Sequence, residues 1–103
     1  MKQSHYRSYV FCLLVGMGAT VVAAPDTDRQ AELLYLLKHD CGSCHGMTRK
    51  GGLGPPLLPE HLNEKPQPLL VNTVLFGRPG TPMPPWGGEL SEQDAQWLVE
   101  AML

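Results

Sequence analysis

The 103-residue sequence is poor in the features from which most small proteins build their stability. Aromatic residues make up 7% of it, charged residues 17%, and only three residues are cysteine. With 8 Lys and Arg against 10 Asp and Glu, it lacks the basic surface expected of a nucleic-acid-binding protein. It shows no clear strand pattern or internal repeat. No acid–base pair or nucleophile stands out either, so the sequence makes no positive case for an enzyme.

The N-terminal segment is predicted to lie outside the folded domain. A basic region with Lys2 and Arg7 precedes an apolar stretch from Val10 to Ala24, which has the length of a signal-peptide hydrophobic region and is too short for a comfortable membrane span. We therefore expect residues 1–23 to be a cleaved signal peptide and residues 24–103 to be a periplasmic domain. An uncleaved anchor is the alternative. Without the two basic residues, 6 basic and 10 acidic side chains remain, a net charge of −4.

The segment Cys41-Gly42-Ser43-Cys44-His45 has the C-x-x-C-H pattern to which c-type haem is attached. Two thiols three residues apart can form thioethers to the two vinyl groups of one porphyrin, and the imidazole that follows can bond the iron through Nε2. A disulfide or half of a zinc site is the alternative, but a zinc site needs two further ligands and the mature chain has no second cysteine pair. We therefore expect one covalent haem c, held by Cys41 and Cys44, with His45 as an axial ligand.

A second axial ligand is expected from the Pro/Gly-rich segment 77–86, in which Met83 stands 38 residues after the histidine of the motif. The flanking prolines pre-set this loop and lower the cost of ordering it. Met47 and Met102 are weaker candidates, because Met47 is too close to the attachment site and Met102 lies in a C-terminal helical segment. His61 would give a bis-His site instead. His/Met ligation is the electron-transfer arrangement of cytochromes c.

Helical patterns account for much of the mature chain. Helices are predicted at residues 29–38, 59–64 and 69–76 and in a C-terminal segment from residue 91. The first should have its N-cap within 26–28, the third should end at Gly77, and Ser91 with Asp94 resembles a capping box. In the first helix, the stripe expected to face the core consists of Ala31, Leu34 or Tyr35, and Lys38, and it is widened by Leu33, Leu36 and Leu37. In the last helix, the stripe consists of Ala95, Leu98, Val99 and Met102, with Trp97 beside it.

With these features in place, residues 26–103 resemble a class I cytochrome c. The segments that carry the resemblance are 41–46, 54–57, 83–86 and 90–98. The resemblance implies an all-α fold in which the N- and C-terminal helices cross over the covalently bound haem. It also implies that the carbonyl of Pro55 accepts the proton of the other ring nitrogen of His45, which fixes the tautomer. Trp86 is expected either to donate its indole N–H to a haem propionate or to pack at the haem edge.

The segment 76–86 is similar to the small cytochromes c55X of denitrifying bacteria, which are encoded beside the haem cd-type nitrite reductase. This resemblance implies a periplasmic one-electron carrier that donates electrons to that reductase. A factor that assists haem d maturation or assembly of the reductase is the alternative, whereas an oxidase-like or peroxidase-like enzyme would need an open iron site. We expect a monomer that binds neither nucleic acid nor, after signal cleavage, a membrane.

Overall fold

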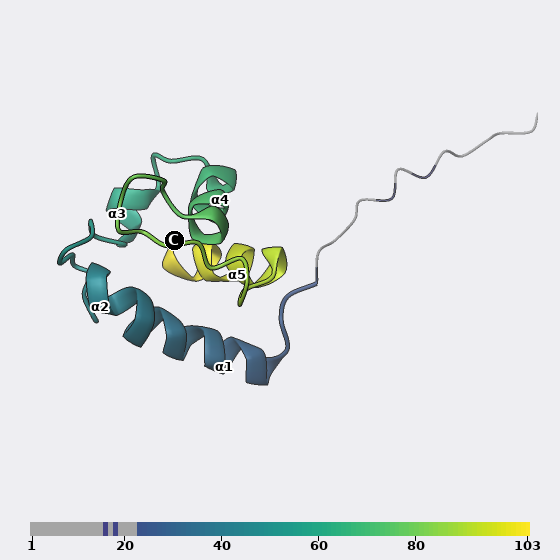
Figure 1. The fold of residues 1–103 in the computed structure, drawn as a ribbon. Helices are drawn as coiled ribbons and strands as arrows, with labels where there is room; N and C mark the ends of the chain where they lie inside the picture. Colours follow the sequence, from purple (N-terminus) through teal and green to yellow (C-terminus); the bar gives the residue numbers. More distant parts are fainter. Residues whose placement is uncertain (1–15, 17, 19–22) are drawn as a thin grey trace, which may run out of the picture.

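The computed structural model describes residues 16, 18 and 23–103 (Figure 1). Apart from residues 16, 18 and 23, the predicted signal peptide lies outside the described residues. Within them the chain is helical and contains no strand, and none of its helices combines the length and apolar character that a membrane crossing requires. The elements are α1 Thr27–Leu36, the π-helical turn η1 Leu37–Cys41, α2 Gly42–His45, α3 Pro59–Leu62, α4 Gln67–Phe76 and α5 Glu92–Met102.

The first three elements form one continuous helix that ends in the C-x-x-C-H motif. It begins where the sequence predicts, because the side chain of Asp26 accepts a hydrogen bond from the backbone N–H of Arg29 at 2.8 Å and caps the helix. Backbone angles stay in the right-handed helical region through η1 into α2. The π-helical turn, a wider turn often found at functional sites, ends on Cys41. The helix therefore delivers the first motif cysteine and continues to His45.

An aliphatic core joins α1, α4 and α5, with α5 lying between the other two in Figure 1. The stripe predicted for α5 is confirmed, since its four members are all buried. The stripe predicted for α1 is wrong in its central members and right in its flanking ones. Leu34 and Tyr35 are exposed, whereas Leu33 and Leu37, which were expected only to widen the stripe, are buried. These two residues lie one helical turn apart and form the face of the helix that belongs to the core. The other buried members of this core are Leu62, Val71, Leu75 and Leu90.

An ion pair locks the first turn of α1 onto the first turn of α5. Arg29 Nη2 lies 2.9 Å from Asp94 Oδ2, and the same guanidinium also donates to the carbonyl of Glu89 and to the Glu32 carboxylate. The predicted capping box is confirmed, since Asp94 N–H donates to Ser91 Oγ and Ser91 N–H donates to the Asp94 carboxylate. Asp94 thus caps its own helix and binds the facing one, and the Arg29 hydrogen bond is the main reason why its pKa is lowered.

The ends of α3 and α4 follow local signals in the sequence. Pro59 occupies the first turn of α3, where its missing N–H is not needed, although the helix ends at Leu62, earlier than predicted. Gly77 ends α4 with a φ of +69°, in the left-handed region that favours glycine. A Cβ on Gly77 would come within 2.7 Å of the Met83 carbonyl oxygen. This glycine therefore both ends the helix and leaves space for the loop that follows.

The Asp94 ion pair should make the stability of the domain depend on pH in the acid range. Because the folded-state pKa of Asp94 is lowered, its contribution is present above the unfolded value of about 4 and is lost as the pH falls through the lower folded value. Asp94→Asn should reduce the free energy of unfolding at neutral pH and flatten its decline below about pH 4. Urea unfolding at a series of pH values measures both effects.

Asp28→Asn provides a matched control, because Asp28 also lies in the first helical turn, in α1, but is exposed. This variant should keep the wild-type pH profile. If the two variants lost the same stability at every pH, the ion pair would not be the source of the acid sensitivity.

Candidate functional site

The motif cysteines lie on the last turns of the long N-terminal helix. Cys41 is half-buried and Cys44 exposed, and no disulfide joins them. Burial is the main cause that raises the pKa of the Cys41 thiol, and the nearby Asp40 charge adds to it. Residues three apart on a helix face the same side, so the two thiols are presented together. The backbone is tightly packed at Gly42, where a Cβ would lie 3.1 Å from the Cα of Met47.

The His45 ring is fixed by the loop that follows it. Its Nδ1 lies 2.7 Å from the carbonyl oxygen of Pro55, the contact that the family resemblance implied. A carbonyl only accepts hydrogen bonds, so Nδ1 carries a proton, and in the neutral ring Nε2 then keeps its lone pair. This is the tautomer that a histidine ligand needs when it binds a metal through Nε2.

The same loop closes against the face of the imidazole. Gly51 N–H donates to the carbonyl of His45, and Gly54 N–H donates to the carbonyl of Cys44, both at 2.8 Å. A Cβ on Gly54 would come within 2.8 Å of the ring atoms Cε1 and Nδ1 of His45. The glycine before Pro55 therefore permits the close approach that the carbonyl contact requires. The family resemblance implied the proline contact but not this packing role of the glycine.

The predicted ligand Met83 lies in the loop between α4 and α5. Met83 and Trp86 are both half-buried, and Trp86 packs against the aliphatic core. The loop is tied back to the last turn of α4, since Trp86 N–H donates to the Val74 carbonyl at 3.0 Å and Gly87 N–H donates to the Leu75 carbonyl at 2.9 Å. The structure thus brings His45 and Pro55 into contact, and it holds Met83 and Trp86 on a separate loop anchored by α4.

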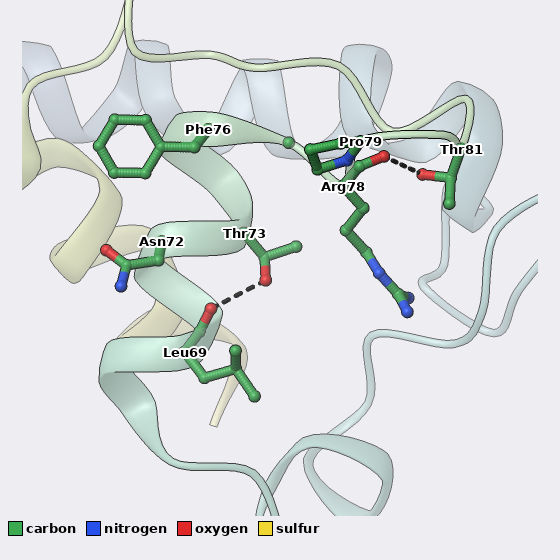
Figure 2. Close-up of a pocket in the computed structure, with 8 residues that line it drawn as sticks. Leu69, Asn72, Thr73, Phe76, Arg78, Pro79 and Thr81 are labelled. Atoms are coloured by element: carbon green, nitrogen blue, oxygen red, sulfur yellow. Dashed lines mark hydrogen bonds between the residues drawn. The ribbon is translucent and has the colours of Figure 1, made fainter.

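A pocket of about 460 Å³ lies beside this loop and is shown in Figure 2. It is lined by the exposed side of α4 and the first residues of the loop, including Leu69, Phe76 and Arg78. None of its lining residues is a predicted haem ligand, so we do not assign it as the haem site.

The residues present fit a covalent haem. Two cysteines that form no disulfide lie on one helix side, next to an imidazole whose tautomer leaves Nε2 free to bind iron. Among the described residues, no group of three or more His, Cys, Asp or Glu side chains could hold a metal ion by itself. Cys41 and Cys44 therefore have no further ligands around them, in the described part, with which to build a zinc site.

Comparison with known proteins agrees with this fit. Residues 28–100 match the family described as cytochrome c oxidase, cbb3-type, subunit III. The chain is 62% identical over 79 residues to cytochrome c55X of Pseudomonas aeruginosa, an alignment that covers 77% of this chain and 66% of that protein. The solved c-type cytochrome NirC superposes with a TM-score of 0.75 at 62% identity, over 76% of this chain and 92% of the other. The chain is a class I cytochrome c of the c55X type.

The cytochrome therefore carries a covalently bound haem c, and the predicted all-α fold is confirmed. A second solved structure, the dihydro-heme d1 dehydrogenase NirN, is 38% identical with a TM-score of 0.62. That likeness covers 66% of the cytochrome but only 15% of the dehydrogenase chain, so it concerns one small part of a larger protein.

Gly54→Ala should destabilise the domain by about 1–3 kcal/mol, the usual cost of inserting an extra methyl group into a packed contact. The His45 ring cannot move away freely, because its Nδ1 is bound to the Pro55 carbonyl. Urea unfolding of the haem-loaded protein, followed by circular dichroism, measures the loss.

Gly88→Ala is the matched control, because a Cβ there would meet nothing within 4 Å. Its stability should stay within about 0.5 kcal/mol of wild type. A Gly54→Ala variant as stable as this control would show that the ring shifts at no cost.

Proposed function

We propose that this cytochrome is an exported one-electron carrier with His/Met ligation. In this proposal Cys41 and Cys44 hold the haem as thioethers, His45 binds the iron through Nε2, and Met83 binds it from the opposite side. The observation that carries the proposal is the 2.7 Å contact between His45 Nδ1 and the Pro55 carbonyl, which leaves Nε2 as the free donor. Bound in this way, haem c supplies a one-electron Fe(III)/Fe(II) couple.

Burial favours Met83 over the other methionines of the mature chain. Met102 is 6% exposed and belongs to the core between the helices, while Met47 is 54% exposed directly after the attachment motif. Met83 is half-buried, and hydrogen bonds hold its loop on both sides of it: Arg78 N–H donates to the Met83 carbonyl, and Trp86 N–H donates to the Val74 carbonyl of α4. A thioether ligand favours the reduced state of iron relative to a second imidazole, which suits a protein that gives electrons away.

The remaining assigned residues have supporting roles. Pro55 orients His45 through its carbonyl, and Trp86 is a candidate donor to a haem propionate. With both axial positions filled by side chains, no position is open for a substrate, so we infer a carrier and not an enzyme. The excess of acidic side chains argues against nucleic-acid binding, and the proposal describes a monomer that does not bind a membrane after signal cleavage.

Export is supported by the basic and then apolar composition of the first 23 residues. We place the mature N-terminus at Ala24 and the cytochrome in the periplasm. The mass of the haem-loaded protein purified from that compartment measures the cleavage point, and a full-length mass recovered from membranes would contradict cleavage.

Met83→Ala should abolish the sulfur-to-iron charge-transfer band and open the iron to carbon monoxide, because the variant lacks the thioether. Absorption spectroscopy of the oxidised and reduced protein measures both. Met47→Ala removes an exposed thioether close to the motif and should leave the band intact. Retention of the band in Met83→Ala would identify another residue as the ligand.

We infer that the physiological acceptor is a haem cd-type nitrite reductase. The support is the similarity to cytochrome c55X and the particular sequence of the Met83 loop. The mature chain carries a net charge of −4, to which haem propionates add, and this charge suits a positive surface around the acceptor's haem. The interface through which the partners exchange electrons should be small and their binding weak, so that they separate quickly.

A second candidate is a role in haem d maturation, which the 38% identity to a segment of dihydro-heme d1 dehydrogenase favours. Stopped-flow mixing discriminates between the electron-donor role and the maturation role. The reduced cytochrome should reduce oxidised nitrite reductase within seconds, at a rate that falls as ionic strength rises, because charges are screened over about 10 Å at 0.1 M salt. If no transfer occurs at any salt concentration, while the oxidised cytochrome accepts electrons from the working dehydrogenase, the maturation role replaces the donor role.

A further inference from the structure

The loop that carries Met83 is closed on itself by backbone hydrogen bonds. Arg78 N–H donates to the carbonyl of Met83 at 3.2 Å, and Thr81 N–H donates to the carbonyl of Arg78 at 3.0 Å. Gly77 lies against the closure, since a Cβ there would come within 2.9 Å of atoms of Met83, Pro84 and Pro85. The six residues from Arg78 to Met83 therefore form a compact turn at the end of α4.

The Thr81 hydroxyl lies at the centre of this turn. It donates to the carbonyl of Arg78 at 2.6 Å and accepts a hydrogen bond from the backbone N–H of Met83 at 3.3 Å. Figure 2 shows Thr81 facing the Arg78 carbonyl across the turn. One hydroxyl thus links the first residue of the turn to the residue that carries the thioether.

The composition of the loop leaves little to replace this link. Of the seven residues 79–85, four are proline and lack a backbone N–H, so only Gly80, Thr81 and Met83 can donate from the backbone. The Thr81 N–H is used within the turn. The Met83 N–H has the Thr81 hydroxyl as its acceptor. The position of Met83 is therefore defined by the Arg78 N–H on its carbonyl side and the Thr81 hydroxyl on its amide side.

We propose that Thr81 is the positioning residue of Met83. The hydroxyl of Thr81 holds the loop in the conformation that presents the thioether of Met83. This inference rests on the proposed function, in which Met83 is an axial ligand. Thr81 itself touches neither iron nor haem in this scheme and acts through the backbone of Met83. Because Thr81 is exposed, water can partly replace its hydroxyl, so the effect is that of one ordinary hydrogen bond, about fivefold in an equilibrium constant.

Imidazole binding to the oxidised protein tests this role. An external imidazole can take the position of Met83 only when the thioether has left, so its apparent dissociation constant is inversely proportional to the fraction of open protein. Thr81→Val keeps the shape of the side chain and removes the hydroxyl. It should lower the apparent dissociation constant about fivefold, measured by the loss of the sulfur-to-iron band during titration.

Three further variants separate this role from general destabilisation. Thr81→Ser keeps the hydroxyl and should match wild type, and Thr81→Ala should match Thr81→Val. Thr73→Val removes a hydroxyl that donates to the Leu69 carbonyl within α4 at 2.8 Å, as Figure 2 also shows, and should leave imidazole binding unchanged.

A double-mutant cycle with Met83→Ala completes the test. Where the thioether is already absent, Thr81→Val should not change the affinity for imidazole. Because this background lacks the sulfur-to-iron band, binding is followed in all four proteins of the cycle by the change in the main haem absorption band. The same fivefold change in that background, or an equal change in Thr73→Val, would overturn the positioning role, as would wild-type binding by Thr81→Val. A wild-type protein without the charge-transfer band, or a Met83→Ala variant that keeps it, would overturn the ligand assignment as well.

Discussion

The hydrogen bond between His45 Nδ1 and the Pro55 carbonyl is the contact on which the proposed haem centre depends. At 2.7 Å it determines which ring nitrogen carries the proton and therefore which one can bind iron. Two backbone bonds return the same loop to the end of the helix, from Gly51 to His45 and from Gly54 to Cys44. Motif, loop and imidazole consequently behave as one unit, and a displacement of the loop would be passed directly to the ring.

His45 ends α2 and Met83 lies in the loop after α4, and each of these predicted axial ligands is held by a loop of the same construction. Each loop follows a helix and is tied back to the carbonyls of its last turn, by Gly54 N–H on Cys44 in one case and by Trp86 N–H on Val74 in the other. The two helices in turn share a core through α5. Sites supported by regular elements hold their geometry more precisely than sites on free loops. Helix packing therefore sets the frame within which a thioether and an imidazole can share one iron.

The parts of the fold that sequence predicts well are the ones decided by neighbouring residues. The Asp26 cap, the Ser91–Asp94 box and the end of α4 at Gly77 each depend on a few consecutive residues, and all three are found. The buried face of α1 depends on where α5 lies, and the sequence therefore centred the stripe on Leu34 or Tyr35 and gave the buried Leu33 only a flanking place.

Contacts between residues far apart in the sequence, and the hydrogen bonds of single side-chain atoms, could not be predicted because they depend on how distant segments pack. Arg29 and Asp94 are 65 residues apart, and neither spacing nor residue type indicates that they meet. The proposed attachment residues Cys41 and Cys44 could be named from the sequence because the C-x-x-C-H pattern is contained in five consecutive residues. The Thr81 hydroxyl bonds could not be predicted, since threonine is common in turns and only the folded structure shows which two backbone groups its hydroxyl joins.

The composition of the core explains why a covalent prosthetic group suits so small a chain. All ten buried hydrophobic residues among those described are aliphatic or methionine. The four aromatic residues of the mature chain remain at the edge of this core or outside it: Tyr35 and Phe76 are exposed, and Trp86 and Trp97 are half-buried. Helices of about ten residues are marginal without tertiary contacts, and a domain of about 80 residues buries little surface of its own. Covalently bound haem c is a large apolar body of the kind that the side chains of this core do not provide, and it links two points of the chain, as metals and disulfides do in other small domains.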